Sequence, residues 1–189
     1  MATLVVGASG ATGKQLVEQL LLMGQHVKPI VRPSANIPNS WNNHEKITII
    51  KANLSGMTLE EKAIKFVLMN TVGYRNRDLN EPISLGQKIV ISIIRALVPP
   101  HSDNEAAAEF LRLNIGQKNA KIQWVVVRPD TLINQNSTTD YNLHVSPTTT
   151  LFKPGKTSRI NVGNFMARLI SEDGLWEEWK GKMPVIYNA

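Results

Sequence analysis

The amino-terminal third of the chain alternates between short apolar runs and a helical pattern. Residues Thr3–Val6 form an apolar, β-branched run that is typical of a strand buried on both faces. From Lys14 to Met23 the apolar side chains recur at helical spacing, and Gly24 is suited to end that helix. A second apolar run, His26–Val31, predicts another strand. The pattern therefore predicts a strand–helix–strand unit.

Later segments predict further elements of an α/β protein. A third strand is expected at 47–51. Residues 84–97 predict a helix that is apolar on all sides, so both a place in the core and a subunit interface remain open. Pro99 and Pro100 are expected to break it before a second helix that runs to about Ile115. The polar stretch 134–150 is expected to be a loop, either over a substrate site or simply on the surface.

Three glycines separate the first strand from the first helix in the stretch GASGATG. Gly7 permits a tight turn, Gly10 lets the backbone approach a pyrophosphate, and Gly13 lets the helix pack closely on the sheet. The N–H groups at the start of such a helix attract phosphate, and the helix dipole adds to that attraction. The pattern predicts a dinucleotide site, with an unliganded tight turn as the alternative. Its expected members in this stretch are Gly7, Ser9, Gly10, Ala11, Thr12 and Gly13.

The end of the second strand bears on the choice between NADP and NAD. An acidic residue about 20 positions after the glycines is the usual partner of the NAD ribose. This chain has Arg32 there, in the stretch PIVRPS, with no carboxylate nearby. An arginine suits a 2′-phosphate, so NADP is the expected cofactor and NAD is less favoured. The alternative is that Arg32 is only a solvated charge at a strand end.

Composition narrows the function classes further. The chain has 189 residues, which suits one domain, and a formal charge of +6 without clustered basic runs. An anionic cofactor explains that charge as well as nucleic acid does, so no nucleic-acid partner is expected. The four histidines are far apart and cysteine is absent, so no metal site is expected. No apolar run is long enough to span a membrane, and we expect a cytoplasmic protein without a membrane partner.

The ordered set of motifs resembles the NmrA-like, atypical branch of the short-chain dehydrogenase/reductase family. Besides the glycines, the matching segments are KFVLMNTVG (65–73), WVVVRPDTL (124–132), GKTSRINVGNFMARLI (155–170) and MPVIYNA (183–189). The resemblance covers most of the chain. It implies a Rossmann-like, doubly wound α/β fold with a mainly parallel sheet flanked by helices, here as one NAD(P)-binding domain (1–189) with a substrate-side portion from about 134. It also implies that Pro129 turns the chain under the nicotinamide.

One region departs from the family pattern. The resemblance places Asn53 and Leu54 beside the adenine, at the end of the third strand. The family then has a helix, a fourth strand and another helix, whereas this chain has only residues 55–64. Ten residues bridge the sheet only if nearly extended, since each spans at most about 3.6 Å. Either a block of chain is absent, or the protein has a smaller sheet; in both cases the fourth-strand region is lacking.

The resemblance gives an incomplete catalytic set. Thr71 matches the family's Ser/Thr position at the end of its fifth strand, but no Tyr-x-x-x-Lys follows. Tyr74 is a second catalytic candidate, with a role as a surface-loop aromatic as the alternative. Hydride transfer needs only the cofactor and correct orientation, so an oxidoreductase acting on a small molecule remains the leading hypothesis. The alternative is a non-catalytic, NADP-dependent redox sensor; a homodimer fits either.

Overall fold

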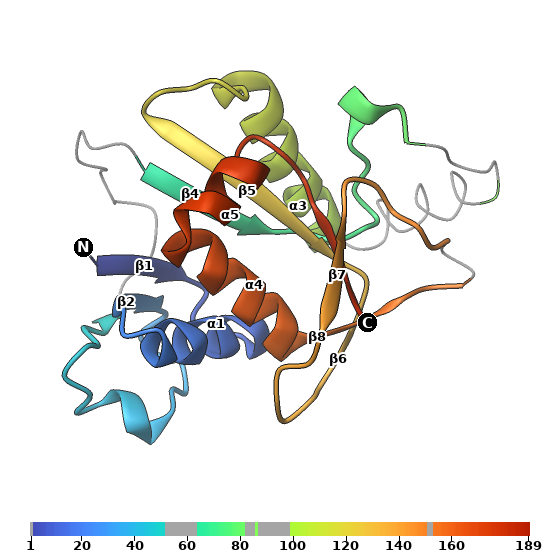
Figure 1. Ribbon diagram of the computed structural model, residues 1–189. Helices are drawn as coiled ribbons and strands as arrows, with labels where there is room; N and C mark the ends of the chain where they lie inside the picture. The colour runs from blue at the N-terminus through green and yellow to red at the C-terminus, as the bar shows by residue number, and fades with distance from the viewer. Residues whose placement is uncertain (1, 52–63, 82–85, 87–98, 151–152) are drawn as a thin grey trace.

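The computed structural model describes residues 2–51, 64–81, 86, 99–150 and 153–189. Its first unit confirms the predicted strand–helix–strand motif (Figure 1). The elements are β1 (Ala2–Val6), α1 (Ala11–Leu22) and β2 (His26–Val31). The helix begins three residues before the predicted start, because the backbone of Gly10 already serves as its N-cap. Gly24 follows the helix with a positive φ of 74°, which few other residues adopt.

The first sheet has the order β1-β2-β3, and both of its ladders are parallel. β3 covers only Ile50–Lys51, shorter than the predicted 47–51, although Ile47 still forms an isolated bridge to Val27. α1 covers one face of this sheet, where its buried side chains meet those of β1 and β2. This cluster contains Val5, Val17, Leu20, Val27 and Trp41, the last from the short helix η1 (Asn39–Trp41).

The second sheet has the order β4-β5-β9-β7. Its strands are β4 (Ile64–Met69), β5 (Ile122–Pro129), β9 (Val185–Asn188) and β7 (Tyr141–His144). The first three are parallel and β7 is antiparallel to β9. β7 lies inside the stretch predicted as a polar loop, and that prediction is wrong for these residues. The reason is the alternation of Tyr141 and Leu143, which pack against the core, with polar neighbours.

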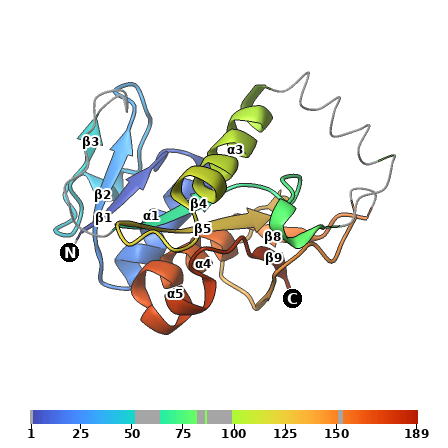
Figure 2. The ribbon, with the colours of Figure 1, turned by 90° about the horizontal axis from the view of Figure 1, so that it is seen from above.

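Helices lie on both faces of the second sheet (Figure 2). They bury β5, the central strand, on both of its faces. Val125 and Val127 face α4 (Arg159–Ser171) and α5 (Asp173–Trp179). Trp124 and Val126 face the other way, toward α3 (Pro99–Phe110) and the π-helical turn Leu111–Ile115 that extends it. The doubly wound α/β arrangement with mainly parallel sheets is therefore confirmed.

Pro99 and Pro100 belong to α3 within the described residues, so the second helix includes both prolines. The predicted break between this helix and residues 84–97 falls on residues outside the described ranges. Trp176 and Trp179 anchor α5 in the core. The predicted helix at 84–97 lies outside the described residues except for residue 86, which is helical. Residues 131–133 (β6) pair with 156–158 (β8) in a separate small sheet.

No ladder among the described residues joins the two larger sheets. β1 is an edge of the first sheet and β4 is an edge of the second, and no strand of the described ranges lies between them. Asn53 and Leu54 lie outside the described residues, as do 55–63 of the segment in which the sequence lacks a fourth strand, whereas Ile64 already begins β4. Among the helices that the structure describes, none is both long and apolar enough to cross a membrane.

Candidate nucleotide-binding site

The glycine turn has the geometry that the spacing predicts. Gly7 has a φ of +72°, a conformation that L side chains rarely adopt, and its carbonyl accepts a hydrogen bond from Gly10 N–H at 3.0 Å. A Cβ on Gly13 would lie 2.2 Å from that same carbonyl oxygen. Position 7 therefore requires glycine for its backbone conformation, and position 13 requires it so that the helix can pack closely on the turn.

Among the described residues, no side chain caps the backbone N–H donors at the amino end of α1. Its N-cap is Gly10, which has no side chain to cap the helix, and the first turn contains no acidic residue. Ser9 is half-buried, Ala11 is exposed and Thr12 is buried. The first N–H groups of a helix lack partners within it, so they can hydrogen-bond an anion, which the helix dipole also attracts. The residues present thus fit a diphosphate.

Arg32 is exposed immediately after β2, at the carboxyl edge of the first sheet. A second cation lies close to it, because Val31 is paired with Lys51 at the end of β3. Lys51 is also exposed. The sequence alone does not predict that Lys51 lies beside Arg32, because this position depends on the register of the two-residue strand β3.

The second sheet brings two other predicted residues together. Thr71 follows β4 and Pro129 ends β5; the N–H of Val72, next to Thr71, donates to the Pro129 carbonyl at 3.1 Å. Pro129 lies within the strand rather than after it, so the turn predicted at this residue comes later. The Thr71 hydroxyl oxygen accepts from Gly73 N–H at 3.3 Å. Thr71 and Pro129 therefore share the carboxyl edge of β4 and β5.

Tyr74 is buried rather than exposed on a surface loop. Its ring packs in a cluster with Ala108, Leu111 and Trp124, on the α3 side of the sheet. Burial, and secondarily the charge of Glu109, raises the pKa of the phenol. Arg112 opposes that shift, but within the described part of the chain no hydrogen bond of acceptable geometry reaches the Tyr74 hydroxyl. A buried phenol with a raised pKa is a weak candidate for proton exchange with a substrate.

A buried ion pair that sequence reasoning missed holds the loop after β4. Arg128, fully buried on β5, forms a two-pronged salt bridge with the buried carboxylate of Glu81, at 2.8 and 3.0 Å. Its other N–H groups donate to backbone carbonyls of Tyr74, Val145 and Met183 at 2.8–3.1 Å. The Arg-Pro dipeptide is visible in the sequence, but no sequence pattern indicates Glu81 as the partner of Arg128. Arg128 thus fixes the loop that begins at Thr71.

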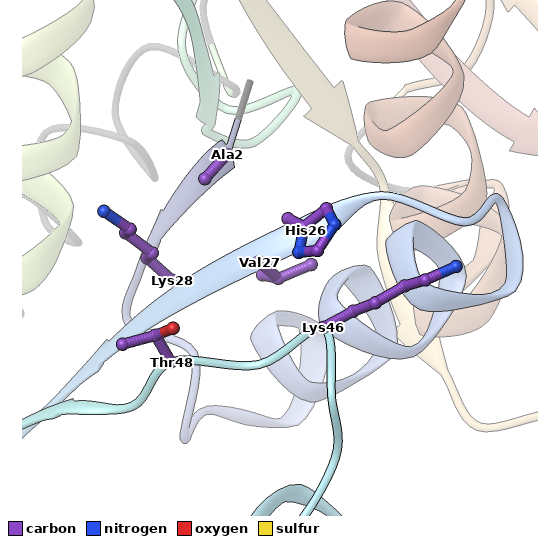
Figure 3. A pocket seen from close by; sticks show the side chains of 6 residues that line it. All are labelled: Ala2, His26, Val27, Lys28, Lys46 and Thr48. Atoms are coloured by element: carbon purple, nitrogen blue, oxygen red, sulfur yellow. The ribbon is translucent and has the colours of Figure 1, made fainter.

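A pocket lies at the opposite end of the first sheet. A cavity of about 250 Å³ is bordered by the amino ends of β1 and β2 and by the chain before β3, whereas the glycine turn follows the carboxyl end of β1 (Figure 3). Its lining residues are Ala2, His26, Val27, Lys28, Lys46 and Thr48. Across the residues that the structure describes, no three potential acidic, histidine or cysteine ligands gather as a metal site would require.

Comparisons with known proteins agree on the fold. No model of a known protein family matches the chain, and no curated protein matches its sequence. Similar solved structures include a short-chain dehydrogenase/reductase from Veillonella parvula in complex with NADP, with a TM-score of 0.68, 16% identity, and coverage of 99% of this chain and 94% of that one. The chain has a Rossmann-like fold.

Two further structures support this assignment. ChuY from Escherichia coli O157:H7, described as an anaerobillin reductase, gives a TM-score of 0.67 at 11% identity and covers 100% of this chain and 97% of its own. The oxidoreductase YlbE from Lactococcus lactis gives 0.65 at 15% identity, with coverage of 100% and 91%. At such low identities the likeness shows the Rossmann-like fold alone, and it is the fold that the sequence motifs predict.

Proposed function

We propose that the protein binds NADP(H) and acts as an oxidoreductase on a small molecule. The observation that carries this proposal is the glycine turn, whose tight geometry leaves the amino end of α1 bare at the carboxyl edge of the first sheet. A Cβ on Gly10 would lie 3.3 Å from the Gly7 carbonyl, so glycine is not needed there for packing as strictly as at Gly13. We propose that position 10 is glycine because a ligand approaches the backbone closely there, which a side chain would prevent.

Electrostatics favours NADP over NAD. Arg32 and Lys51 are both exposed at the carboxyl edge beside the turn, and a 2′-phosphate is the part of NADP that NAD lacks. The likeness to a structure that contains NADP agrees with this preference. Thr71 and Pro129 are proposed to border the nicotinamide end, with Asn53 and Leu54 beside the adenine. Residues from about 134 onward are proposed to form the substrate side of a single domain that works in the cytoplasm.

Calorimetric titration with NADP and with NAD tests the proposal. We expect NADP to bind more tightly, and Arg32→Ala to weaken NADP binding by about tenfold, or 1.4 kcal/mol, while NAD binding changes little. Lys28→Ala is the matched control, because Lys28 is an exposed cation on the same strand but lies toward its amino end. Equal affinities for the two dinucleotides, unchanged by Arg32→Ala, would refute the phosphate assignment. Absence of binding to either would refute the function.

A redox sensor is the second candidate. The sequence lacks the Tyr–Lys pair of the resembled family, and the ring of Tyr74 is buried in a core cluster. These observations favour a protein that binds NADP without reducing a substrate. Mixing the protein with NADPH and a panel of quinones, aldehydes and flavins distinguishes the two, because oxidation of NADPH removes its near-ultraviolet absorbance. Binding without turnover across the panel would favour the sensor, and turnover would favour the enzyme.

A further inference from the structure

The chain turns tightly as it leaves β4 at the carboxyl edge of the second sheet. The N–H of Tyr74 donates to the Thr71 carbonyl at 3.1 Å, which closes a four-residue turn. Such a turn keeps its first and last Cα atoms within about 7 Å, so the Cα of the next residue, Arg75, lies within about 11 Å of that of Thr71. Figure 1 shows this green segment leaving β4 at the end of the sheet where the arrow of β5 also ends. Arg75 therefore lies near the edge that Thr71 and Pro129 share.

The backbone on both sides of Arg75 is fixed by the buried ion pair. The carbonyl of Tyr74 accepts from Arg128 Nη1 at 3.1 Å, and the N–H of Asn76 donates to Glu81 Oε2 at 2.8 Å. Arg128 and Glu81 are themselves buried and bonded to each other. Arg75 thus extends from a segment that is held at the residue before it and at the residue after it. A residue that positions a ligand needs a rigid base of this kind.

The guanidinium of Arg75 has no partner within the described parts of the chain. Arg75 is half-buried, and neither a hydrogen bond nor an ion pair of its side chain is found there. An arginine side chain has five N–H donors and keeps its charge at any physiological pH. Partial removal of such a charge from water costs free energy unless an acceptor compensates for it. An anionic ligand that bonds Arg75 would provide that compensation.

The carboxylates of this loop and of the helical turn beside it are already held by other arginines. Arg112 contacts Asp78 at 2.6 Å and Glu109 at 2.8 Å, and Arg77 contacts Glu109 at 3.0 Å. Glu81 forms the two-pronged pair with Arg128 that is described above. The described residues of this region therefore supply no counter-charge for Arg75, and its charge is available to a ligand.

The cofactor is not expected to supply an anion at this edge. NADP carries its negative charge on the diphosphate and the 2′-phosphate, which are proposed to lie at the glycine turn and at Arg32, both in the first sheet unit. The nicotinamide ring, proposed to lie beside Thr71 and Pro129, has no negative charge. An anion that meets Arg75 would therefore belong to the substrate. A single guanidinium matches a carboxylate, with one charge, better than a phosphate monoester, with nearly two at pH 7.

We propose that Arg75 binds a carboxylate group of the substrate, so that the preferred substrates are small molecules with a carboxylate. This assignment rests on the proposed function, because it places the nicotinamide at the same edge. The planar fork of an arginine donates two parallel hydrogen bonds to a carboxylate. Such a pair fixes the orientation of the substrate as well as its position, which a reaction with a bound cofactor requires.

The test uses the full chain with 2-naphthoate as the probe and 2-naphthamide as its uncharged analogue. Binding is followed by NMR titration of the probe signals, with and without NADP. We expect 2-naphthoate to bind at least about tenfold more tightly than the amide, as a charge-assisted pair provides. Arg75→Gln should abolish this preference without changing NADP affinity, and Arg75→Lys should retain part of it. Arg77→Gln is the matched control, because Arg77 is an exposed arginine of the same loop that is paired with Glu109; it should leave the preference intact.

Four results would overturn the proposal. Equal binding of the acid and the amide, or no binding of either, would exclude a carboxylate site. A preference that persists in Arg75→Gln would assign it to another cation. Tighter, Arg75-dependent binding of 2-naphthyl phosphate would identify a phosphate as the ligand. Weaker NADP binding by Arg75→Gln would mean that Arg75 contacts the cofactor instead.

Failure of the proposed function has a different signature. Arg75-dependent binding of 2-naphthoate without any NADP binding would refute the oxidoreductase but keep the carboxylate site. NADP binding without a preference for the acid would refute the carboxylate site alone. If Arg75→Gln fails to fold, as judged by circular dichroism, the unmodified protein decides. Phenylglyoxal modifies guanidinium groups, and 2-naphthoate, unlike 2-naphthamide, should protect Arg75 from it in peptides analysed by mass spectrometry; equal protection by both would exclude the site.

Discussion

Removing the carboxylate of Glu81 should destabilise the protein strongly, because it leaves a buried charge without its partner. All five N–H groups of Arg128 have acceptors, and two of these are the Glu81 oxygens. Breaking a buried pair from one side costs about 3–5 kcal/mol. Glu81 also accepts from the buried N–H of Asn76 at 2.8 Å, which loses its partner as well. Glu81→Ala should therefore lower the melting temperature by about 6–20 °C.

Urea unfolding followed by circular dichroism measures this cost and separates charge from packing. The double variant Arg128→Met/Glu81→Leu removes both charges, so it should lose clearly less stability than the two single variants added together. Glu81→Ala with a loss below about 1 kcal/mol would refute the reasoning, since a loss that small is typical of an exposed ion pair. Additive losses in the double variant would likewise show that the two groups do not depend on each other.

Three further predictions address the glycine turn, Tyr74 and the start of α4. Gly13→Ala should lose about 1–3 kcal/mol by overpacking, whereas Gly174→Ala, which meets no atom within 4 Å, should not; equal melting temperatures would contradict this. The raised pKa of Tyr74 contributes stability below about pH 10 that is lost as pH rises through the folded pKa. Tyr74→Phe should therefore flatten the fall in unfolding free energy at alkaline pH, and an unchanged profile would argue against the shift. Ser158→Ala should lose about 1 kcal/mol in urea unfolding, because Ser158 caps α4 by accepting from Asn161 N–H; no loss would contradict that cap.

Local sequence signals predicted the first unit of the fold well. The bounds of β2 agree with the predicted strand His26–Val31, and the positive φ of Gly7 and Gly24 matches the roles assigned to them. These features depend on residues close together in the chain: an apolar run, a glycine in a conformation that few other residues adopt, and a helical repeat between them. Such patterns can be interpreted without knowing the tertiary structure.

Features that depend on distant partners were missed. β7 is stabilised by pairing with β9, more than 40 residues later, and its four residues look polar on average. Glu81 and Arg128 are 47 residues apart, and neither shows from sequence that it is buried. The alternative prediction for Tyr74 is an aromatic side chain on a surface loop, whereas in the structure α3 covers its ring. In each case a long-range contact decides the outcome, and one sequence contains no direct signal for it.

Within the described residues, the packing of α4 on α1 links the two halves of the proposed cofactor site. The glycine turn belongs to the first sheet and the Thr71–Pro129 edge to the second, and no described ladder connects the sheets. What holds them is the packing of α4 on α1, where a Cβ on Gly163 would lie 2.9 Å from the backbone of Gln15 and Leu16. Helix packing tolerates little change in separation without rearrangement. Close packing at Gly163 therefore contributes to the distance between the proposed diphosphate and nicotinamide positions.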